Sequence, residues 1–336
     1  MKSWRPLLLL LVFCAVAALC LTSTFKYIRQ GNPQDVRTRP EFGIAMMGGG
    51  SDLDEAFRWL CGKANGGDFL ILRARGSADY NPYVAGLCKV NSVATLIIPN
   101  RKAAMKPRVA EIIAQAEAIF IAGGDQARYV NFWKGTPVED AINAHVAAGK
   151  PIGGTSAGLA VLGEFVYGAL GDKLNDADLA SGEVLADPYI KRVTVVHDFL
   201  KVPLLANILT DSHFAQRDRM GRSLGFLARI VTNADGADGW SKAPREIAID
   251  EKSALLVEES GRAKVVGTGR GVYFLQVTEA PEVCKPGQPL TLRNVAAYHA
   301  PTGAEFDVRS WEGDGGEAYE ISVEKGRVAA SKEAMY

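Results

Sequence analysis

The most constraining feature of this sequence is a regular alternation that begins at residue 41. Short apolar runs with the composition of β-strands alternate with longer amphipathic segments, and the runs are FGIAMM, DFLILRA, VATLIIP and AIFIAGG. Parallel strands need long crossover connections, which are usually helices that cover both faces of the sheet. We therefore predict a doubly wound, mostly parallel α/β sheet, with a short fifth strand at residues 151–153.

Two segments between these runs carry helix signals. In residues 51–64, Ser51 is a candidate N-cap with Asp54 three positions later, and residues 106–116 have a proline near their start. The polar residues 170–192 interrupt the alternation and predict an insertion or a loop. Short β-like runs with turn residues between them follow from EIAIDEKSALLVE onward. We expect a catalytic domain over residues 41–275 and a small β-rich C-terminal extension over residues 276–336.

The first residues have the layout of an export signal. A short basic start precedes the apolar run LLLLLVFCAVAALCL, and a polar stretch follows. The competing interpretation of residues 1–24 is an uncleaved membrane anchor, although the run is shorter than the ~20 residues of a typical spanning helix. We predict an exported protein, periplasmic or extracellular, with any membrane attachment through this segment only.

Net charge and cysteine content argue against two classes of function, nucleic-acid binding and metal binding. The 38 basic and 38 acidic side chains cancel, which gives no general attraction to nucleic acid. Beyond the signal, Cys61, Cys88 and Cys284 form no C-x-x-C pair, so we predict no metal site. In an oxidising compartment Cys61 and Cys88 form either a disulfide or two buried thiols.

The strongest local signal is Gly154-Thr155-Ser156-Ala157-Gly158, which matches G-x-S-x-G between a short strand and a helix-like segment. A serine on such a sharp turn needs small neighbours, because larger side chains clash with the turn and cover the hydroxyl. We predict that Ser156 is a nucleophile and that the N–H of Ala157 stabilises an oxyanion. The alternative is a glycine-rich junction with a capping serine.

A serine nucleophile needs a base, and the chain has four histidines. His145 is expected on the surface of a helix, and His299 lies in the β-rich tail. His197 follows an apolar run and ranks second. We favour His213, because it follows the apolar run LLANILTD, where an α/β site is expected, and heads a dense polar run.

Two further runs accompany this histidine. In DSHFAQRDRMGR, the side chains of Asp211, Arg217, Arg219 and Arg222 form either a substrate site or a solvated helix start. Three arginines at these positions cannot share one helical face, so some are expected to point inward to a carboxylate. In the other run, Gly123-Gly124-Asp125-Gln126, glycine N–H groups are candidates for the second half of an oxyanion hole. The run Gly48-Gly49-Gly50 is explained by tight-turn packing.

Taken in order, GGDQ, GGTSAG and DSHFAQRDRMGR resemble the cyanophycinase branch of the peptidase E-like (S51) serine peptidases, over residues 41–275. The resemblance implies a flavodoxin-like sheet of the class I glutamine amidotransferase type and a homodimer. The family's substrate is polyaspartate with arginine on each side-chain carboxyl, and its product is β-aspartyl-arginine. The resemblance thus implies an exported serine peptidase that hydrolyses β-aspartyl-arginine links of cyanophycin or a similar aspartyl peptide, with no cofactor.

Carried over by position, the resemblance makes Ser156 the nucleophile and His213 its base. The matched substrate contacts are Gln126, Asp211, Arg217, Arg219 and Arg222, whereas the oxyanion donors Gly124 and Ala157 are predicted from the turns themselves. Asp172 is our choice for the triad acid, with Asp176 and Asp178 left open. Ser212 departs from the family pattern, and the β-rich tail has no counterpart in it. The alternative from another class is a non-catalytic exported protein that binds a peptide or a cell-wall component.

Overall fold

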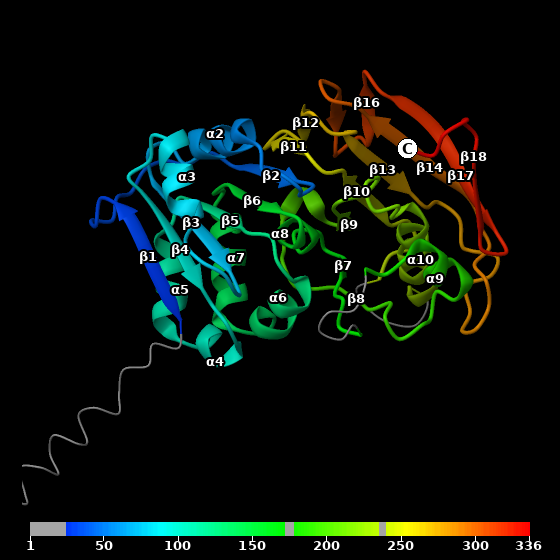
Figure 1. Cartoon of the computed structure of the whole chain (residues 1–336), viewed down its shortest axis with the longest axis horizontal. Coiled ribbons are helices and arrows are strands. Elements are labelled where there is room, and N and C mark those ends of the chain that lie inside the picture. Colours follow the sequence, from blue (N-terminus) through cyan, green and yellow to red (C-terminus); the bar gives the residue numbers. More distant parts are fainter. Residues whose placement is uncertain (1–24, 172–177, 235–239) are drawn as a thin grey trace, which may run out of the picture.

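The computed structural model describes residues 25–171, 178–234 and 240–336. Five parallel strands form its central sheet, which confirms the predicted α/β class: β2 (Gly43–Met47), β3 (Asp68–Arg73), β4 (Ser92–Ile97), β5 (Ala118–Ile121) and β6 (Ile152–Thr155). Their order across the sheet is β4-β3-β5-β6-β2. The predicted apolar runs therefore became neighbouring strands, and their carboxyl ends share one edge (Figure 1).

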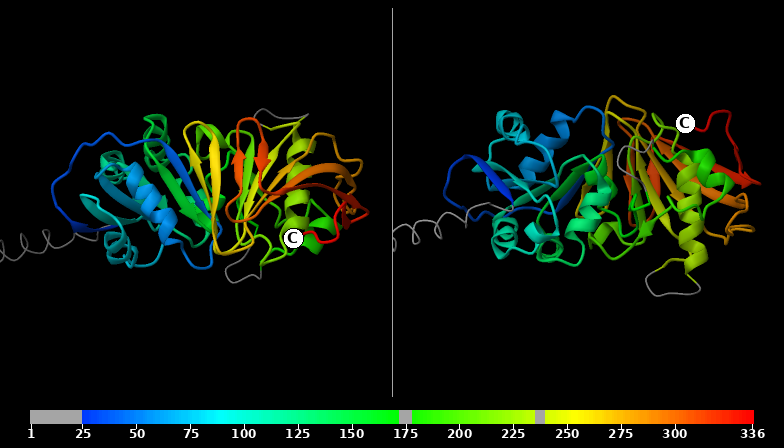
Figure 2. Two further views of the ribbon diagram at one scale, coloured as in Figure 1. Left: turned by 90° about the horizontal axis from the view of Figure 1, so that it is seen from above. Right: turned by 60° about the horizontal axis from the view of Figure 1, so that its bottom comes forward.

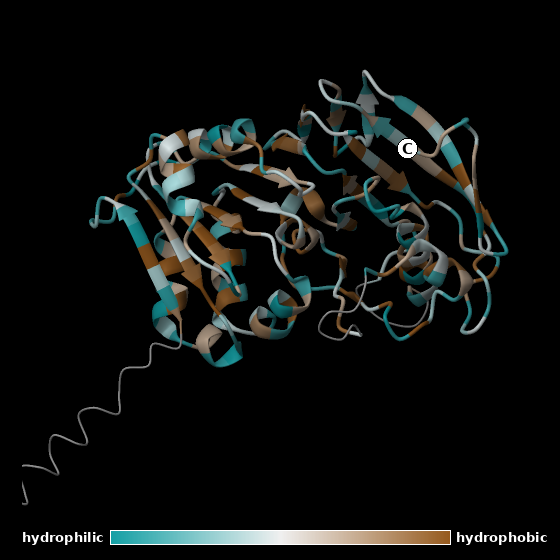
Figure 3. Ribbon diagram, viewed as in Figure 1, coloured by the Kyte–Doolittle hydropathy of each residue, from teal (hydrophilic) through white to brown (hydrophobic). Residues whose placement is uncertain are grey.

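Helices cover both faces of these strands. One face carries α2 (Asp54–Lys63) and α3 (Tyr80–Leu87), whose Phe57 and Val84 share a buried cluster with Phe120 of β5. The opposite face carries α4 (Arg101–Ala104), α5 (Pro107–Gln115), α6 (Gln126–Trp133) and α7 (Pro137–Ala147). Alternate strand residues supply the two clusters, because successive side chains point to opposite faces. Brown, apolar strands lie between helices with teal outer faces in Figure 3.

Further strands widen this sheet in the antiparallel sense. β1 (Lys26–Gly31) pairs with β4 at one edge, and on the other side β11 (Ser253–Glu258) pairs with β2. Beyond β11 lie β12 (Arg262–Gly267), β15 (Glu305–Asp307) and β16 (Glu312–Asp314). The hairpin of β15 and β16, from the C-terminal extension, thereby becomes part of the large sheet.

A second sheet has six strands in the order β18-β17-β14-β13-β10-β9. Their bounds are β9 (Ile208–Asp211), β10 (Arg245–Ile249), β13 (Val272–Gln276), β14 (Leu292–Ala300), β17 (Glu317–Glu324) and β18 (Arg327–Ala330). Only β9 and β10 are parallel. The helices α9 (Ser181–Ala186) and α10 (Met220–Asn233) pack on this sheet through Val184 and Leu224. Figure 2 shows the yellow strands standing between the two ends of the molecule.

The remaining elements are short. They are α8 (Ala157–Ala160), the 3-10 helix η1 (Pro203–Leu205) and the paired strands β7 (Val166–Tyr167) and β8 (Val195–Val196). The β-rich character of the C-terminal region is confirmed, and its strands extend both sheets. Within the part of the chain described, no helix is both long and apolar enough to cross a bilayer. The predicted signal or anchor, residues 1–24, lies outside the described residues.

Three local predictions were wrong. Helix α2 begins after Leu53, and no side chain caps it, so Ser51 is not its N-cap. Residues 181–186 of the expected loop form α9, because Val184 and Leu185 are buried against the second sheet. His145 is only 3% exposed, since its face of α7 points inward and its Nε2 lies 3.0 Å from the Pro151 carbonyl oxygen.

Of the two possibilities for the early cysteines, the structure has the disulfide. Cys61 lies near the end of α2 and Cys88 directly follows α3, and the bond closes a loop of sequence separation 27. It ties together the two helices on one face of the sheet. Cys284 is a free, buried thiol.

Candidate active site

Ser156 occupies the turn between β6 and α8. Its backbone has φ 52° and ψ −119°, a conformation that non-glycine residues rarely adopt and that the surrounding structure must enforce. One restraint is the Ser156 N–H, which donates a hydrogen bond to the Met47 carbonyl at the end of β2, with an N–O distance of 3.1 Å. The side chain is only partly buried, so the hydroxyl lies at the end of the strand, as a nucleophile elbow requires.

The glycines around Ser156 are required by close backbone contacts. A Cβ on Gly154 would lie 2.5 Å from the Gly158 carbonyl oxygen, and a Cβ on Gly158 would lie 2.0 Å from that of Ile121. Both distances are far inside van der Waals contact. The spacing G-x-S-x-G therefore has a steric origin here.

His213 follows β9 and has its imidazole beside the serine. Its Nε2 lies 2.7 Å from the Ser156 Oγ. The His213 backbone is also left-handed, with φ 48°, and its N–H donates a hydrogen bond to the Gly48 carbonyl at 2.8 Å. The end of β2 thus holds both residues, since the carbonyl of its last residue, Met47, accepts from Ser156 and that of the next residue, Gly48, accepts from His213.

The glycine run after β2 makes room for this imidazole. Gly49 has φ +95°, and a Cβ there would lie 2.4 Å from the Cε1 of His213. Tight-turn packing, which we inferred from the sequence, therefore explains part of the need for glycine at position 49. The other part is that any side chain at Gly49 displaces the histidine ring.

The other imidazole nitrogen meets a carboxylate that the sequence analysis did not single out. Glu251 lies in the turn between β10 and β11, and its Oε1 is 2.6 Å from the His213 Nδ1. Asp172 and Asp176 lie outside the described residues. Asp178 is described, and its carboxylate pairs instead with Arg219 and Arg222, at 2.6 and 3.2 Å.

Glu251 has a sequence signal of the same kind as His213. It follows the apolar strand EIAI, in the run Asp250-Glu251, at the end of a strand in the second sheet. It was missed because this strand was assigned to a run of β-hairpins and not to the edge that carries the site. The pairing of β11 with β2 brings its turn to His213.

Burial sets the charge state of the histidine. Desolvation lowers the pKa of His213 below its ordinary value, the hydrogen bond that its Nδ1–H donates to Glu251 opposes that change, and the positive charges of Arg217 and Arg219 lower the pKa further. The imidazole is therefore neutral at neutral pH. A neutral ring with its Nδ1–H donated to Glu251 leaves Nε2 free to accept the serine proton.

The arginines that follow His213 form an ion-pair network. Arg222 has a side chain only 1% exposed and makes a bidentate pair with Asp211, with both distances from its Nη2 at 2.7 Å. Arg219 pairs with Asp211 at 3.1 Å as well as with Asp178. The prediction that some arginines reach inward to a carboxylate is confirmed.

The substrate roles predicted for Asp211, Arg219 and Arg222 need correction. Their side chains are at most 8% exposed, and their charged groups are taken up by one another and by Asp178. Breaking such a buried pair leaves an uncompensated charge, so these residues hold the histidine segment in place. Arg217 is 44% exposed, 3.6 Å from Asp178 and 3.9 Å from Glu251. Its role as a substrate contact stays a prediction.

The other histidines have different partners. The Nδ1 of His197 lies 2.6 Å from Asp198, and its ring lies edge-on against Trp240. His299 stacks on Tyr273, and its Nε2 lies 2.6 Å from the Arg270 carbonyl. His213 alone among the described histidines contacts Ser156.

The turn Gly123–Gln126 joins β5 to α6 beside the serine. A Cβ on Gly123 would lie 3.4 Å from the Cβ of Ser156, so this turn borders the hydroxyl. Gly124 has φ +152°, and Asp125 caps α6 by accepting a hydrogen bond from the Ala127 N–H. Oxyanion donation by Gly124 and Ala157, and substrate contact by Gln126, stay predictions.

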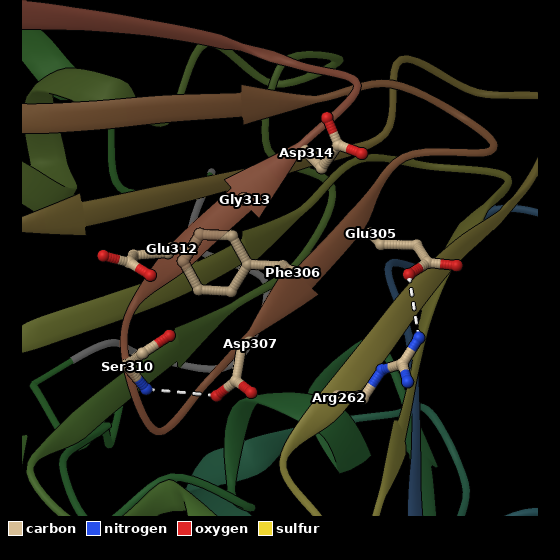
Figure 4. Close-up of a pocket in the computed structure, with 8 residues that line it drawn as sticks. All are labelled: Arg262, Glu305, Phe306, Asp307, Ser310, Glu312, Gly313 and Asp314. Atoms are coloured by element: carbon tan, nitrogen blue, oxygen red, sulfur yellow. Dashed lines mark hydrogen bonds and ion pairs between the residues drawn. The ribbon is translucent and has the colours of Figure 1, made fainter.

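Two surface pockets differ in their relation to this site. A cleft of about 260 Å³ has Gly123 and Gly124 in its lining; Ser156 does not line it, but Gly123 borders Ser156. Another, of about 340 Å³, lies on β12, β15 and β16 (Figure 4). Arg262 pairs there with Glu305 at 3.4 Å, and none of Ser156, His213 and Glu251 lines this pocket.

The α/β sheet and a serine at an elbow, hydrogen-bonded through histidine to a carboxylate, define a serine-type hydrolase. Residues 46–178 match the model of peptidase family S51. The chain is 25% identical over 301 residues to "Cyanophycinase" of Trichormus variabilis, covering 84% of this chain and 89% of that one. The chain is therefore similar to S51 peptidases over residues 46–178 and to a cyanophycinase over most of its length.

The chain is also similar to a second cyanophycinase and to a peptidase of known structure. "Cyanophycinase" of Synechococcus elongatus is 29% identical over 235 residues, which cover 66% of this chain and 62% of the relative. Among solved structures, a peptidase from an acI-B1 Actinobacterium aligns with a TM-score of 0.48 and 18% identity, over 72% of this chain and 96% of that one.

Proposed function

We propose that this chain is an exported serine peptidase that cuts cyanophycin, or a similar aspartyl polymer, with Ser156, His213 and Glu251 as its catalytic groups. The observation that carries the proposal is the 2.7 Å contact between the Ser156 Oγ and the His213 Nε2 at a strained elbow. A hydroxyl in this position can pass its proton directly to the imidazole.

The proposed reaction has two halves. In the first, the Ser156 Oγ attacks the carbonyl carbon of the scissile amide while His213 Nε2 takes the hydroxyl proton. The same nitrogen then protonates the leaving amine, the C–N bond breaks, and an acyl-serine forms. In the second half, His213 deprotonates a water that attacks the ester, and the proton returns to Ser156 as the acid product leaves.

The rest of the site supports these steps. Glu251 fixes the tautomer with Nδ1 protonated and stabilises the imidazolium that forms transiently. The N–H groups of Ala157, the first residue of α8, and of Gly124 are the donors proposed for the oxyanion. Each such donor is worth roughly 2.7–4 kcal/mol of transition-state stabilisation in serine peptidases.

We infer the proposed substrate from the similar proteins, which are named cyanophycinases. Counting the bonds corrects the expectation from the sequence, which placed the cut at the β-aspartyl-arginine link. If β-aspartyl-arginine is released intact, the side-chain link to arginine survives, so the bond that breaks is the amide between consecutive backbone aspartates. We therefore propose cleavage of the polyaspartate backbone and not of the β-aspartyl-arginine link itself.

The test uses purified protein and insoluble cyanophycin, with products identified by mass. Backbone cleavage releases β-aspartyl-arginine, whereas cleavage of the side-chain link releases free arginine. Ser156→Ala is expected to abolish release, and Ser310→Ala, an exposed serine between β15 and β16, is the control. If wild-type protein releases neither product at any pH between 5 and 9, the substrate proposal is wrong. A panel of α- and β-aspartyl peptides then identifies a different peptidase specificity.

Non-catalytic binding is the alternative from another class. The hydrogen-bonded serine and histidine speak against it, because a site kept only for binding has no need of a strained serine beside a neutral imidazole. A fluorophosphonate probe separates the two. Covalent labelling of wild-type protein that is absent in Ser156→Ala supports a hydrolase, and no labelling in either supports a binder.

Export is the second part of the proposal. It is supported by the basic and apolar start of the chain and by the Cys61–Cys88 disulfide, since disulfides persist mainly in oxidising compartments. Cell fractionation followed by intact-mass measurement tests it. Recovery of reduced, full-length protein from the cytoplasm would contradict it, and full-length protein in the membrane fraction would identify an anchor. Homodimerisation stays a prediction that light scattering can test.

A further inference from the structure

The cleft beside Ser156 has a position that suits substrate recognition. One wall is the turn after β3, which contains Arg75, and the other is the turn after β5 together with Arg128 of α6. β3, β5 and β6 are consecutive neighbours in the sheet, and Ser156 follows β6. Since parallel strands end at one edge, the arginines, the glycine turn and the nucleophile follow one another along it.

Both walls are held in place by side chains behind them. The Arg73 guanidinium donates hydrogen bonds to the Arg75 and Ser77 carbonyl oxygens, each at 2.8 Å. It fills the space where Gly76 lacks a side chain, because a Cβ there would lie 2.4 Å from an Arg73 nitrogen. On the other wall, the buried Tyr129 hydroxyl donates to the Ala122 carbonyl at 2.6 Å. The cleft is therefore formed before any ligand arrives.

The charges in the cleft favour an anion. The carboxylate of Asp125 is committed, since one oxygen accepts the Ala127 N–H at 2.9 Å and the other lies 3.2 Å from Arg128 Nε. In the described part of the chain, the terminal amino groups of Arg128 and the side chain of Arg75 have no hydrogen-bond partner. Two guanidinium groups against one carboxylate leave a net positive charge in a volume of about 260 Å³, which fits a single side-chain group.

We propose that this cleft is a specificity subsite in which Arg75 and Arg128 bind a carboxylate of the substrate residue next to the scissile bond. The inference rests on the proposed peptidase function and adds the recognition chemistry. Two sources of the carboxylate are compatible with an aspartyl polymer. One is the free side chain of an unmodified aspartate, and the other is the α-carboxylate of an arginine attached to that side chain. Guanidinium groups form charge-assisted, bidentate contacts with either.

The experiment compares three short aspartyl peptides with one scissile backbone amide. The first carries β-linked arginine with its free α-carboxylate, the second has that carboxylate converted to the carboxamide, and the third has an unmodified aspartate. Variants are Arg75→Gln and Arg128→Gln. The matched control is Arg108→Gln, because Arg108 also forms an ion pair with an acid three residues away on a helix, at 3.1 Å from Glu111, but does not line the cleft.

Wild-type protein is expected to cleave a carboxylate peptide about tenfold better than the carboxamide, in kcat/KM, as one charged hydrogen bond allows. Either cleft variant should reduce that preference to about twofold or less, mainly through KM, whereas Arg108→Gln should keep the preference of the wild type. High salt should also reduce it. Which carboxylate peptide is preferred identifies the source.

Equal cleavage of all three peptides by wild-type protein overturns the subsite while leaving the peptidase function intact. If no peptide is cleaved, the peptidase function fails, and labelling of Ser156 by peptide phosphonates still tests the cleft. Phosphonates with the free carboxylate should then label faster than the carboxamide in wild-type protein and equally in Arg128→Gln. Equal labelling of wild-type protein by both overturns the inference.

Discussion

Replacing Glu251 by glutamine tests the most specific assignment of the structure. The glutamate accepts the Nδ1–H of His213 at 2.6 Å and is only 24% exposed. Glutamine keeps the size of the side chain but removes the charge, and its amide group can donate to Nδ1. That donation favours the tautomer with a proton on Nε2, which then cannot accept the Ser156 proton.

The expected fall in kcat follows from the loss of the negative charge and of the correct histidine tautomer. In serine peptidases, replacement of the triad acid lowers kcat by roughly 10⁴-fold, which corresponds to about 5.5 kcal/mol. Here Arg217 also lies 3.9 Å from Glu251 and the pair is partly solvated. We expect a loss of about 10²–10⁴-fold in kcat for Glu251→Gln, with KM and thermal unfolding nearly unchanged.

The assay is steady-state hydrolysis of an aspartyl peptide, together with the rate of fluorophosphonate labelling. Glu258→Gln is the control, because Glu258 ends the same strand that begins after Glu251 and pairs with Lys63 at the surface. Activity of Glu251→Gln within threefold of wild type would refute the assignment. Loss of activity on changing Asp172 or Asp176, with Glu251→Gln active, would identify the other acid.

Three further predictions concern neighbouring residues. Gly49→Ala should lower kcat/KM at least 10²-fold with an unchanged circular dichroism spectrum, because its Cβ would lie 2.4 Å from the His213 ring; Gly62→Ala, with open space around it, is the control. Arg217→Gln should move the acid limb of the kcat/KM profile to higher pH, because the arginine lowers the pKa of His213; an unmoved limb contradicts this. Burial raises the pKa of Glu246 to about 8, so the folded state keeps a proton that the unfolded state releases above about pH 4.5. The free energy of unfolding should therefore fall between pH 5 and 8 in wild type, and urea titrations of Glu246→Gln should show a smaller fall.

Site residues could be predicted from the sequence where neighbouring residues determine their position. The requirement for glycines around Ser156 is steric and lies within five residues, so the pattern was sufficient. His213 was found by elimination and by its place after a strand. The position of Glu251 depends on β11 lying beside β2, a pairing between residues more than 200 positions apart that no local pattern encodes.

Burial was the other quantity that the sequence did not provide. Asp211 and Arg222 are residue types that are common in binding sites. Here they form a buried ion pair, because the segment that contains them lies against the second sheet. His145 shows the reverse case, where a helix face assumed to be solvated is packed. The five parallel strands were predictable because hydrophobic runs and their spacing are properties of the sequence itself.

The division of the site between two sheets has a consequence for the timing of activity. Ser156 follows a strand of the large sheet, whereas His213 and Glu251 follow β9 and β10 of the second. A nascent chain that has emerged only as far as α8 carries a hydroxyl with no proton acceptor. We expect the chain to stay inert during synthesis and to gain hydrolytic activity only when the later segments have docked.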